Sequence, residues 1–220
     1  MSTDLRLQRY ALAATTAPIA VMSMSASAEI IYESIDVTIG GIGSVAEEFD
    51  VNIGGYGSAR FYAGQNIAGP TYLAAVRAPG GNKSDSPIEF FVTGKTSKKD
   101  PVIDARRFAE GQLIDGGNRD QSVNFASFNP FGADIFPNGE FAFGGNGYVG
   151  FTIDAGDGLR YGWVELSWNA IFKLLTIEGF AYETQVGASI NAGEGIPAPG
   201  ALGLFGLAAG AAGIRRKRKL

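Results

Sequence analysis

Short apolar runs that alternate with polar residues, separated by turns rich in glycine, asparagine and aspartate, limit the possible folds of this chain most strongly. From Glu29 onward no stretch keeps a helical period, so the pattern predicts strands. Aromatic and β-branched residues are plentiful beside 32 glycines in 220 residues, which favours a folded domain over disorder. The predicted strands are Ile30–Ile39, Glu48–Ile53, Ala59–Ala63, Tyr72–Arg77, Ile88–Thr93, Ser122–Phe125, Glu140–Phe143, Tyr148–Asp154, Leu159–Trp168 and Phe172–Glu183.

Strands of this length and spacing must bury one face against a second layer. The sequence therefore predicts an all-β, antiparallel two-sheet sandwich, jelly-roll-like in its connections. Its centre is expected at Tyr148–Asp154 and Leu159–Trp168, two strands joined by a turn in which Gly156 and Gly158 permit a positive φ.

The last two predicted strands carry apolar residues on both faces. In Leu159–Trp168, Tyr161 and Trp163 share one face, whereas Val164, Leu166 and Trp168 share the other, so this strand should be covered on both sides. Strict alternation in the next strand places Phe172, Leu174, Phe180 and Tyr182 on one face and Leu175 and Ile177 on the other.

The polar stretch Lys95–Arg119 is predicted to be a long loop, with one helical turn at Ala105–Glu110. Long loops at the ends of sandwiches commonly carry binding surfaces, although a plain solvated loop is the alternative.

Residues 1–28 have the order of a secretory signal peptide. Arg6 and Arg9 lie in a charged start, Ala11–Met24 is mostly apolar, and Ala26 and Ala28 form the small-residue pair that signal peptidase accepts. Cleavage after Ala28 would leave Glu29 as the first residue of the body.

Residues 197–220 have the order of a membrane-sorting tail. Pro197, Ala198 and Pro199 open an uncharged run through Ile214, and a short transmembrane helix is predicted over 199–214. Eighteen helical residues from Pro197 span about 27 Å, close to a hydrocarbon core of roughly 30 Å. The basic end consists of Arg215, Arg216, Lys217, Arg218 and Lys219, and the positive-inside rule places it in the cytoplasm and the body outside.

This tail resembles the PEP-CTERM sorting signal, which exosortases recognise in bacteria that make exopolysaccharide. The resemblance covers Pro197–Leu220, and Ala198 stands where the family usually has glutamate. The resemblance implies that an exosortase-like enzyme cuts the tail near Pro197–Pro199 and releases or attaches the body. A permanent membrane anchor is the alternative. The body segments Tyr161–Ser167 and Leu175–Glu183 are also similar to bodies of PEP-CTERM proteins of unknown function.

Charge and composition exclude several classes of function. Residues 29–196 carry 21 acidic and 11 basic side chains, so phosphate backbones would repel them and no nucleic-acid partner is expected. The chain contains neither cysteine nor histidine. Disulfides, thiolate nucleophiles, the usual zinc sites and Ser-His-Asp triads are therefore excluded.

Three sets of residues could still carry chemistry. Glu165 and Glu178, on neighbouring predicted strands, could act as the carboxylate pair of a glycoside hydrolase, or be plain solvated glutamates. Asp154 and Asp157 are weak candidates for a Ca²⁺ site in the hairpin turn. The aromatic candidates for stacking on sugar rings are Tyr56, Tyr62, Tyr72, Trp163 and Trp168, which could equally be core residues.

The sequence thus favours a non-enzymatic, exported cell-surface or extracellular-matrix protein without a cofactor. Its expected partners are signal peptidase, an exosortase-like enzyme, the cytoplasmic membrane and exopolysaccharide. An exported carbohydrate-binding module is the alternative, and a carboxylate-pair hydrolase is a third reading.

Overall fold

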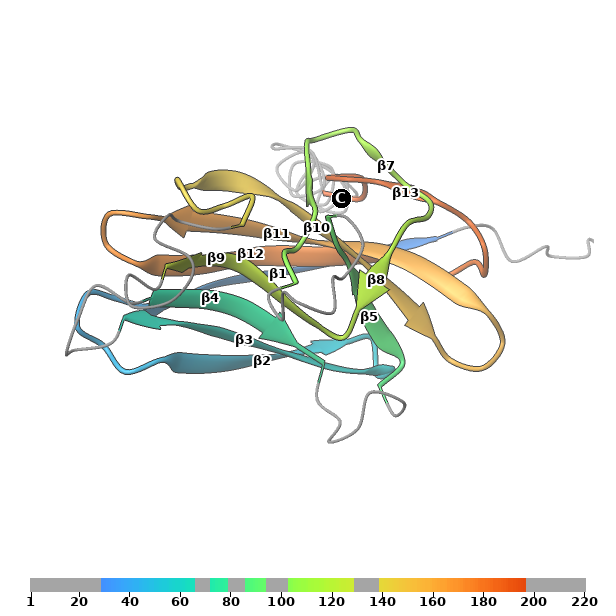
Figure 1. Cartoon of the computed structure of the whole chain (residues 1–220). Coiled ribbons are helices and arrows are strands. Elements are labelled where there is room, and N and C mark those ends of the chain that lie inside the picture. Colours follow the sequence, from blue (N-terminus) through green and yellow to red (C-terminus); the bar gives the residue numbers. More distant parts are fainter. Residues whose placement is uncertain (1–28, 66–71, 79–85, 94–102, 129–138, 197–220) are drawn as a thin grey trace, which may run out of the picture.

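The computed structural model describes residues 29–65, 72–78, 86–93, 103–128 and 139–196, and all structural statements below concern these residues (Figure 1). They form an all-β body of antiparallel sheets and contain no helix. The predicted fold class is confirmed at this level.

The larger sheet holds the centre that the sequence predicts. Its strand order is β1 (Ile30–Gly40), β12 (Leu174–Glu183), β11 (Leu159–Asn169), β10 (Gly145–Asp154), β5 (Ile88–Phe91) and β8 (Arg119–Asp120), and β6 (Arg107–Phe108) also pairs with β10. The β10–β11 hairpin is antiparallel from Gly145 opposite Trp168 to Asp154 opposite Leu159, as predicted.

The smaller sheet has the order β2 (Glu47–Ile53), β3 (Gly57–Gln65), β4 (Tyr72–Arg77) and β9 (Ser122–Phe128). Two short strands, β7 (Leu113–Ile114) and β13 (Ile190–Asn191), pair with each other. Figure 1 shows the smaller sheet lying against one face of the larger sheet, with β7 and β13 on the other side.

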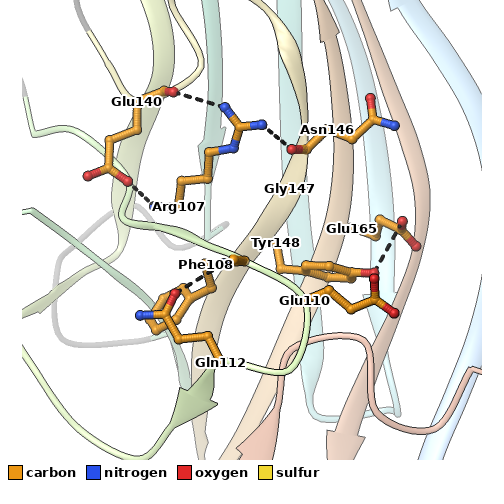
Figure 2. A pocket seen from close by; sticks show the side chains of 10 residues that line it. Arg107, Phe108, Glu110, Gln112, Glu140, Asn146, Gly147, Tyr148 and Glu165 are labelled. Carbon is orange, nitrogen blue, oxygen red and sulfur yellow. Dashed lines mark hydrogen bonds between the residues drawn. The ribbon is translucent and has the colours of Figure 1, made fainter.

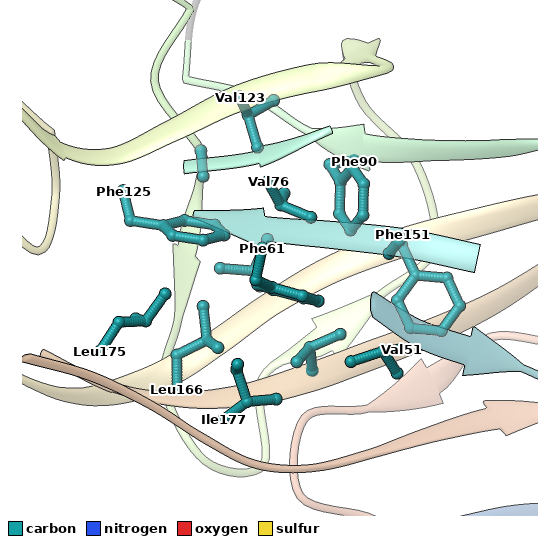
Figure 3. Close-up of a cluster of buried hydrophobic side chains, with 14 of the residues drawn as sticks. Val51, Phe61, Val76, Phe90, Val123, Phe125, Phe151, Leu166, Leu175 and Ile177 are labelled. Carbon is teal, nitrogen blue, oxygen red and sulfur yellow. The ribbon is translucent and has the colours of Figure 1, made fainter. Parts of the chain in front are cut away.

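A hydrophobic core fills the space between the two sheets (Figure 3). Phe61 and Phe125 of the smaller sheet stack with ring centroids 6.0 Å apart. Leu166, Leu175 and Ile177 of the larger sheet complete the same cluster and are fully buried. Alternation of apolar and polar residues gives each sheet one apolar face. The two apolar faces pack against each other and form this core, because each must be shielded from water.

A second apolar cluster covers the outer face of the larger sheet. It consists of Phe91, Phe108, Ile114, Tyr148, Trp163, Ala181, Ile190 and Ala192. Trp163 is fully buried there, and its Nε1 donates to the carbonyl oxygen of Glu194 at 3.2 Å. β11 is therefore covered on both faces, as its sequence predicts.

The predicted strand Glu140–Phe143 is wrong, because these residues form a turn. The amide of Ala142 donates to the carbonyl oxygen of Gly139 at 3.0 Å, and the amide of Gly144 donates to the carbonyl oxygen of Phe141 at 2.8 Å. Positive φ values at Gly139 and Gly144 bend the chain on each side. Phe141 is still fully buried, so its apolar character reflects the core and not a strand.

The described part of the predicted loop, residues 103–119, contains the short strands β6, β7 and β8. The predicted helical turn at Ala105–Glu110 is wrong, because Ala105 bridges to Val92 and β6 pairs with β10. Phe108 and Ile114 are buried in the outer cluster, which holds this segment against the sheet.

A β-bulge overturns the predicted faces of β12. Glu165 of β11 lies opposite Gly179 and Leu166 lies opposite Ile177, so Glu178 is an extra residue. An extra residue shifts the alternation by one position, and Leu175 and Ile177 therefore share the inter-sheet core with Phe180 and Tyr182. Phe172 precedes the strand and is exposed in the turn before it.

The first and last described residues lie close together. The amide of Thr184 donates to the carbonyl of Glu29 at 3.0 Å, which extends the pairing of β1 with β12. A Cβ built on Gly195 would lie 2.5 Å from Cγ2 of Ile30, so the last described residues pack on the start of β1.

Candidate functional site

A cavity of about 810 Å³ opens on the outer face of the larger sheet, beside the apolar cluster (Figure 2). Strands β10 and β11 form its floor, and β6 with the loop that follows forms one wall. The lining residues are Arg107, Phe108, Ala109, Glu110, Gln112, Glu140, Asn146, Gly147, Tyr148 and Glu165.

Arg107 lies flat on the glycine-rich start of β10. Its guanidinium donates to the carbonyl oxygens of Glu140 and Asn146, and its backbone amide donates to the Glu140 carboxylate. A Cβ on Gly147 would lie 2.6 Å from Nε of Arg107, so glycine is needed for this close approach. These hydrogen bonds fix Arg107 at one side of the cavity, where its role is structural.

Tyr148 brings a hydroxyl group to the other side. Its ring packs edge-on against Trp163 with centroids 5.1 Å apart, and the residue is only 7% exposed. The hydroxyl donates to Oε1 of Glu165 at 3.4 Å, a long hydrogen bond. Figure 2 shows the Glu110 carboxylate on the same side of the cavity as this hydroxyl.

The electrostatics of the cavity disfavour negative charge. Burial raises the pKa of Glu165, the neighbouring carboxylates of Glu178 and Glu110 raise it further, and the hydrogen bond from Tyr148 opposes them. Burial, together with the charges of Glu165 and Glu110, raises the pKa of Tyr148 to about 12. Groups with perturbed pKa values inside a cavity are typical of functional sites.

The structure brings Glu165 and Glu178 onto paired strands, as the sequence predicts. Glu165 lines the cavity, whereas Glu178 is the extra residue of the β12 bulge and is not among the lining residues. Sequence reasoning missed Glu110, Arg107 and Tyr148. Glu110 reaches the cavity only because residues 103–114 fold back over the sheet, and its local sequence carries no signal of this.

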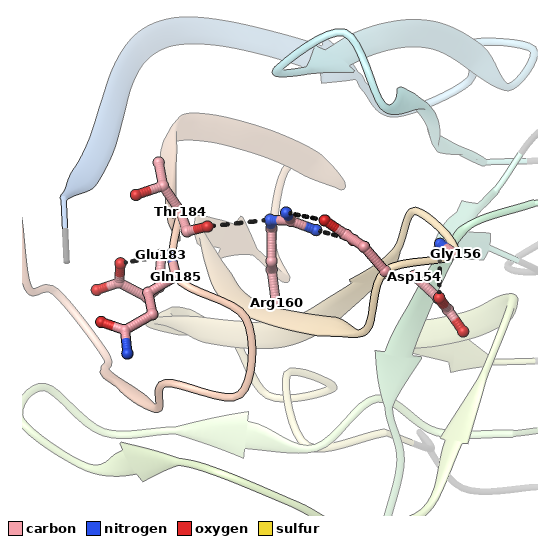
Figure 4. A network of polar contacts seen from close by, with 7 residues as sticks. Asp154, Gly156, Arg160, Glu183, Thr184 and Gln185 are labelled. Carbon is pink, nitrogen blue, oxygen red and sulfur yellow. Dashed lines mark hydrogen bonds and ion pairs between the residues drawn. The ribbon is translucent and has the colours of Figure 1, made fainter. Parts of the chain in front are cut away.

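The hairpin turn gives its two aspartates different partners. Asp157 pairs with Arg160 through both oxygens at 2.6 Å, and this guanidinium lowers the pKa of Asp157. Oδ1 of Asp154 accepts from the amide of Gly156 at 3.0 Å, and Nε of Arg160 donates to the carbonyl of Thr184 at 3.1 Å (Figure 4). Within the described ranges, no group of three or more acidic side chains is arranged to hold a metal ion.

Most of the aromatic candidates lie in the interior. Trp163, Trp168 and Tyr72 are at most 5% exposed, so the structure contradicts their use as sugar-stacking surfaces. Tyr56 is partly buried and packs edge-on against Tyr182. Tyr62 is half-buried and alternates with the buried residues of β3, so it faces away from the core.

The predicted processing residues lie outside the described part of the chain, except Glu29, which pairs with Thr184 as described above. The signal-cleavage pair Ala26 and Ala28, the tripeptide Pro197–Pro199 and the cluster Arg215–Lys219 remain predictions. Among the described residues, no helix is both long and apolar enough to cross a membrane.

The fold and the site together define an all-β domain with a polar cavity on the outer face of its larger sheet. No family model matches the chain, and no curated protein or solved structure matches it either.

Proposed function

We propose that the chain is an exported, non-enzymatic cell-surface or extracellular-matrix protein, sorted through a PEP-CTERM-like tail. The observation that carries this proposal is the order of segments in the sequence: a leader ending at Ala28, a body, and a tail that runs from Pro197 through an apolar stretch to five basic residues. The acidic body suits an exported protein, because it has no charge attraction to nucleic acid.

The arrangement of the body supports the same proposal. Glu29 pairs beside the end of β12, and Gly195 packs on Ile30, so both flanking segments join the body at one place. A single membrane could therefore receive the leader and the tail together. In this proposal signal peptidase cuts after Ala28, an exosortase-like enzyme acts near Pro197, and the body then associates with exopolysaccharide.

We also propose that the sandwich is jelly-roll-like in its connections. Passage of the chain between the two sheets after β1, β4, β8 and β9 supports this proposal. The meanders β2-β3-β4 and β10-β11-β12 each stay within one sheet and limit that likeness.

A second candidate, an exported ligand-binding module, is favoured by the cavity at Tyr148 and Glu165. Sugar binding by aromatic stacking loses most of its support, because both tryptophans are buried. The cavity offers carboxylates, amides and a phenol instead, and polar groups of this kind fix the orientation of a ligand in small-molecule sites.

Mass spectrometry of both ends of the mature protein, purified from the producing cells, tests the main proposal. We expect an N-terminus at Glu29 and a C-terminus within Pro197–Pro199. A mature chain that starts before Glu29 and retains Arg215–Lys219 would overturn the sorting proposal.

A further inference from the structure

Two carboxylates on the same side of the cavity have no cationic partner among the described residues. The charges of Glu110 and Glu165 both raise the pKa of Tyr148. No ion pair joins either carboxylate to a described lysine or arginine. Arg107 lines the same cavity, but its guanidinium is held by two carbonyl oxygens and lies 4.8 Å from the centroid of the Phe141 ring.

This arrangement places negative charges close to a partly buried carboxylate. Glu165 is partly removed from solvent, and the charges of Glu178 and Glu110 add repulsion to the penalty of burial. Tyr148 as a whole is only 7% exposed, and the one hydrogen bond of its hydroxyl within the described residues is the 3.4 Å contact with Glu165. A positively charged hydrogen-bond donor placed between these groups would relieve the repulsion and supply shorter hydrogen bonds.

The volume of the cavity and the number of its polar groups indicate which kind of cation it could bind. Within the described ranges, the acidic side chains form no group of three or more that could hold a metal ion. A cavity of about 810 Å³ has room for an organic molecule. A primary ammonium group carries three N–H donors, which match the two carboxylates and the phenol oxygen.

We propose that the cavity beside β6, β10 and β11 is a binding site for a small organic molecule with a primary ammonium group, held by Glu110, Glu165 and Tyr148. Amino sugars and ethanolamine headgroups share this chemistry. Neutral sugars and N-acetylated amines lack the charge and should bind poorly. The proposal does not depend on the processing of either terminus.

Isothermal titration calorimetry on the full chain in detergent micelles tests the proposal, with glucosamine, O-phosphoethanolamine, N-acetylglucosamine and glucose as probes. We expect one of the two amines to bind at least about tenfold more tightly than both neutral probes, a difference equivalent to about 1.4 kcal/mol. The tighter of the two amines identifies the source, an amino sugar or a lipid headgroup.

Matched variants show whether the cavity is responsible. Glu110→Gln should weaken amine binding at least about tenfold, because it removes one charge and keeps the shape of the side chain. Glu33→Gln, an exposed position on β1, is the control and should leave the affinity unchanged. Unchanged thermal midpoints of both variants establish that they are folded.

Three results would overturn the proposal. They are the failure of both amines to bind more tightly than the two neutral probes, full affinity in the folded Glu110→Gln variant, and no binding of either amine at millimolar concentration. If Glu110→Gln does not fold, folded Tyr148→Phe, which removes only the hydroxyl, must bind the amine more weakly than the unchanged chain. Full affinity in Tyr148→Phe would then overturn the proposal.

Discussion

At the scale of single residues, Gly162 sets how closely β10 and β11 can pack around Phe151. The two residues are directly opposite in the hairpin, and the Phe151 ring lies over the glycine. A Cβ on Gly162 would lie 2.3 Å from Cζ of Phe151 and 2.7 Å from the carbonyl oxygen of Ala181. One side of this space is backbone, so it cannot yield by a rotamer change alone.

Gly162→Ala is therefore expected to lower the free energy of unfolding by about 1–3 kcal/mol, the usual effect of overpacking a core. Urea unfolding followed by tryptophan fluorescence measures the change. Gly116→Ala is the matched control, because a Cβ there meets nothing within 4 Å. Equal stability of the two variants would contradict the packing described for Phe151.

The raised pKa of Glu165 makes stability depend on pH. Burial and the neighbouring carboxylates raise its pKa in the folded state, so the folded protein binds the proton more strongly than the unfolded chain does. Stability is therefore lost as pH rises from the unfolded value, about 4.3, through the raised folded value, and the loss is complete above it.

Glu165→Gln should consequently stabilise the protein at pH 7, because the amide has no charge to bury. At pH 3 the glutamate is protonated in both states, and the two proteins should be equally stable. Urea midpoints at both pH values test this prediction, with Glu33→Gln as an exposed control. A variant that is less stable than the unchanged chain at pH 7 would show that the carboxylate is favourably placed.

At the scale of elements, the β10–β11 hairpin is closed by an ion pair. Arg160, only 8% exposed, joins Asp157 to the carbonyl of Thr184 at the end of β12. The carboxylate that a Ca²⁺ site would need is therefore already engaged. EDTA should leave the thermal midpoint of the full chain unchanged, and differential scanning calorimetry with and without EDTA checks this. A clear drop in the midpoint would restore the Ca²⁺ hypothesis.

The strand positions followed from local patterns, whereas the bulge and the turn did not. Alternation along Glu48–Ile53 or Tyr72–Arg77 depends on residues within one strand, so a single sequence carries it. Glu178 is recognised as an extra residue only when β12 is paired with β1 and β11. The sequence of β12 alone does not show how its residues pair with those strands. Phe141 and Ala142 read as strand because they are buried, and burial in a turn gives the same apolar signal.

The cavity was predictable only in part, for a similar reason. The sequence named Glu165 as a candidate carboxylate on a central strand. Its pKa is raised, as is common for groups at functional sites. Its neighbour Glu110 is 55 positions away in the chain. The electrostatic effect of Glu110 on Tyr148 and Glu165 depends on burial of Phe108 and Ile114, which fixes the path of residues 103–114 over the sheet.

At the scale of the whole molecule, the basic end of the tail is expected to act as a cytoplasmic stop. Each cationic side chain costs roughly 2.5–3.5 kcal/mol at the centre of a membrane on insertion scales, so five together resist transfer. Replacement of Arg215–Lys219 by serine should release intact, uncleaved chain into the exported soluble fraction. Immunoblotting of cell fractions with antibodies against the body and the tail measures this.

The unchanged chain provides the comparison. Its mature surface form should lack residues 201–220. A mature form that keeps these residues and stays in the membrane, in cells with an active sorting enzyme, would identify the tail as a permanent anchor.

The packing of Gly195 on Ile30 has a mechanical consequence for such a chain. In the proposed sorting pathway, two polypeptide segments would hold the body at one pole and restrict its rotation while both flanking segments are embedded. Removal of the leader would leave one covalent link at that pole, about which the body could rotate. The same body could then turn its cavity toward or away from the membrane without any change in its fold.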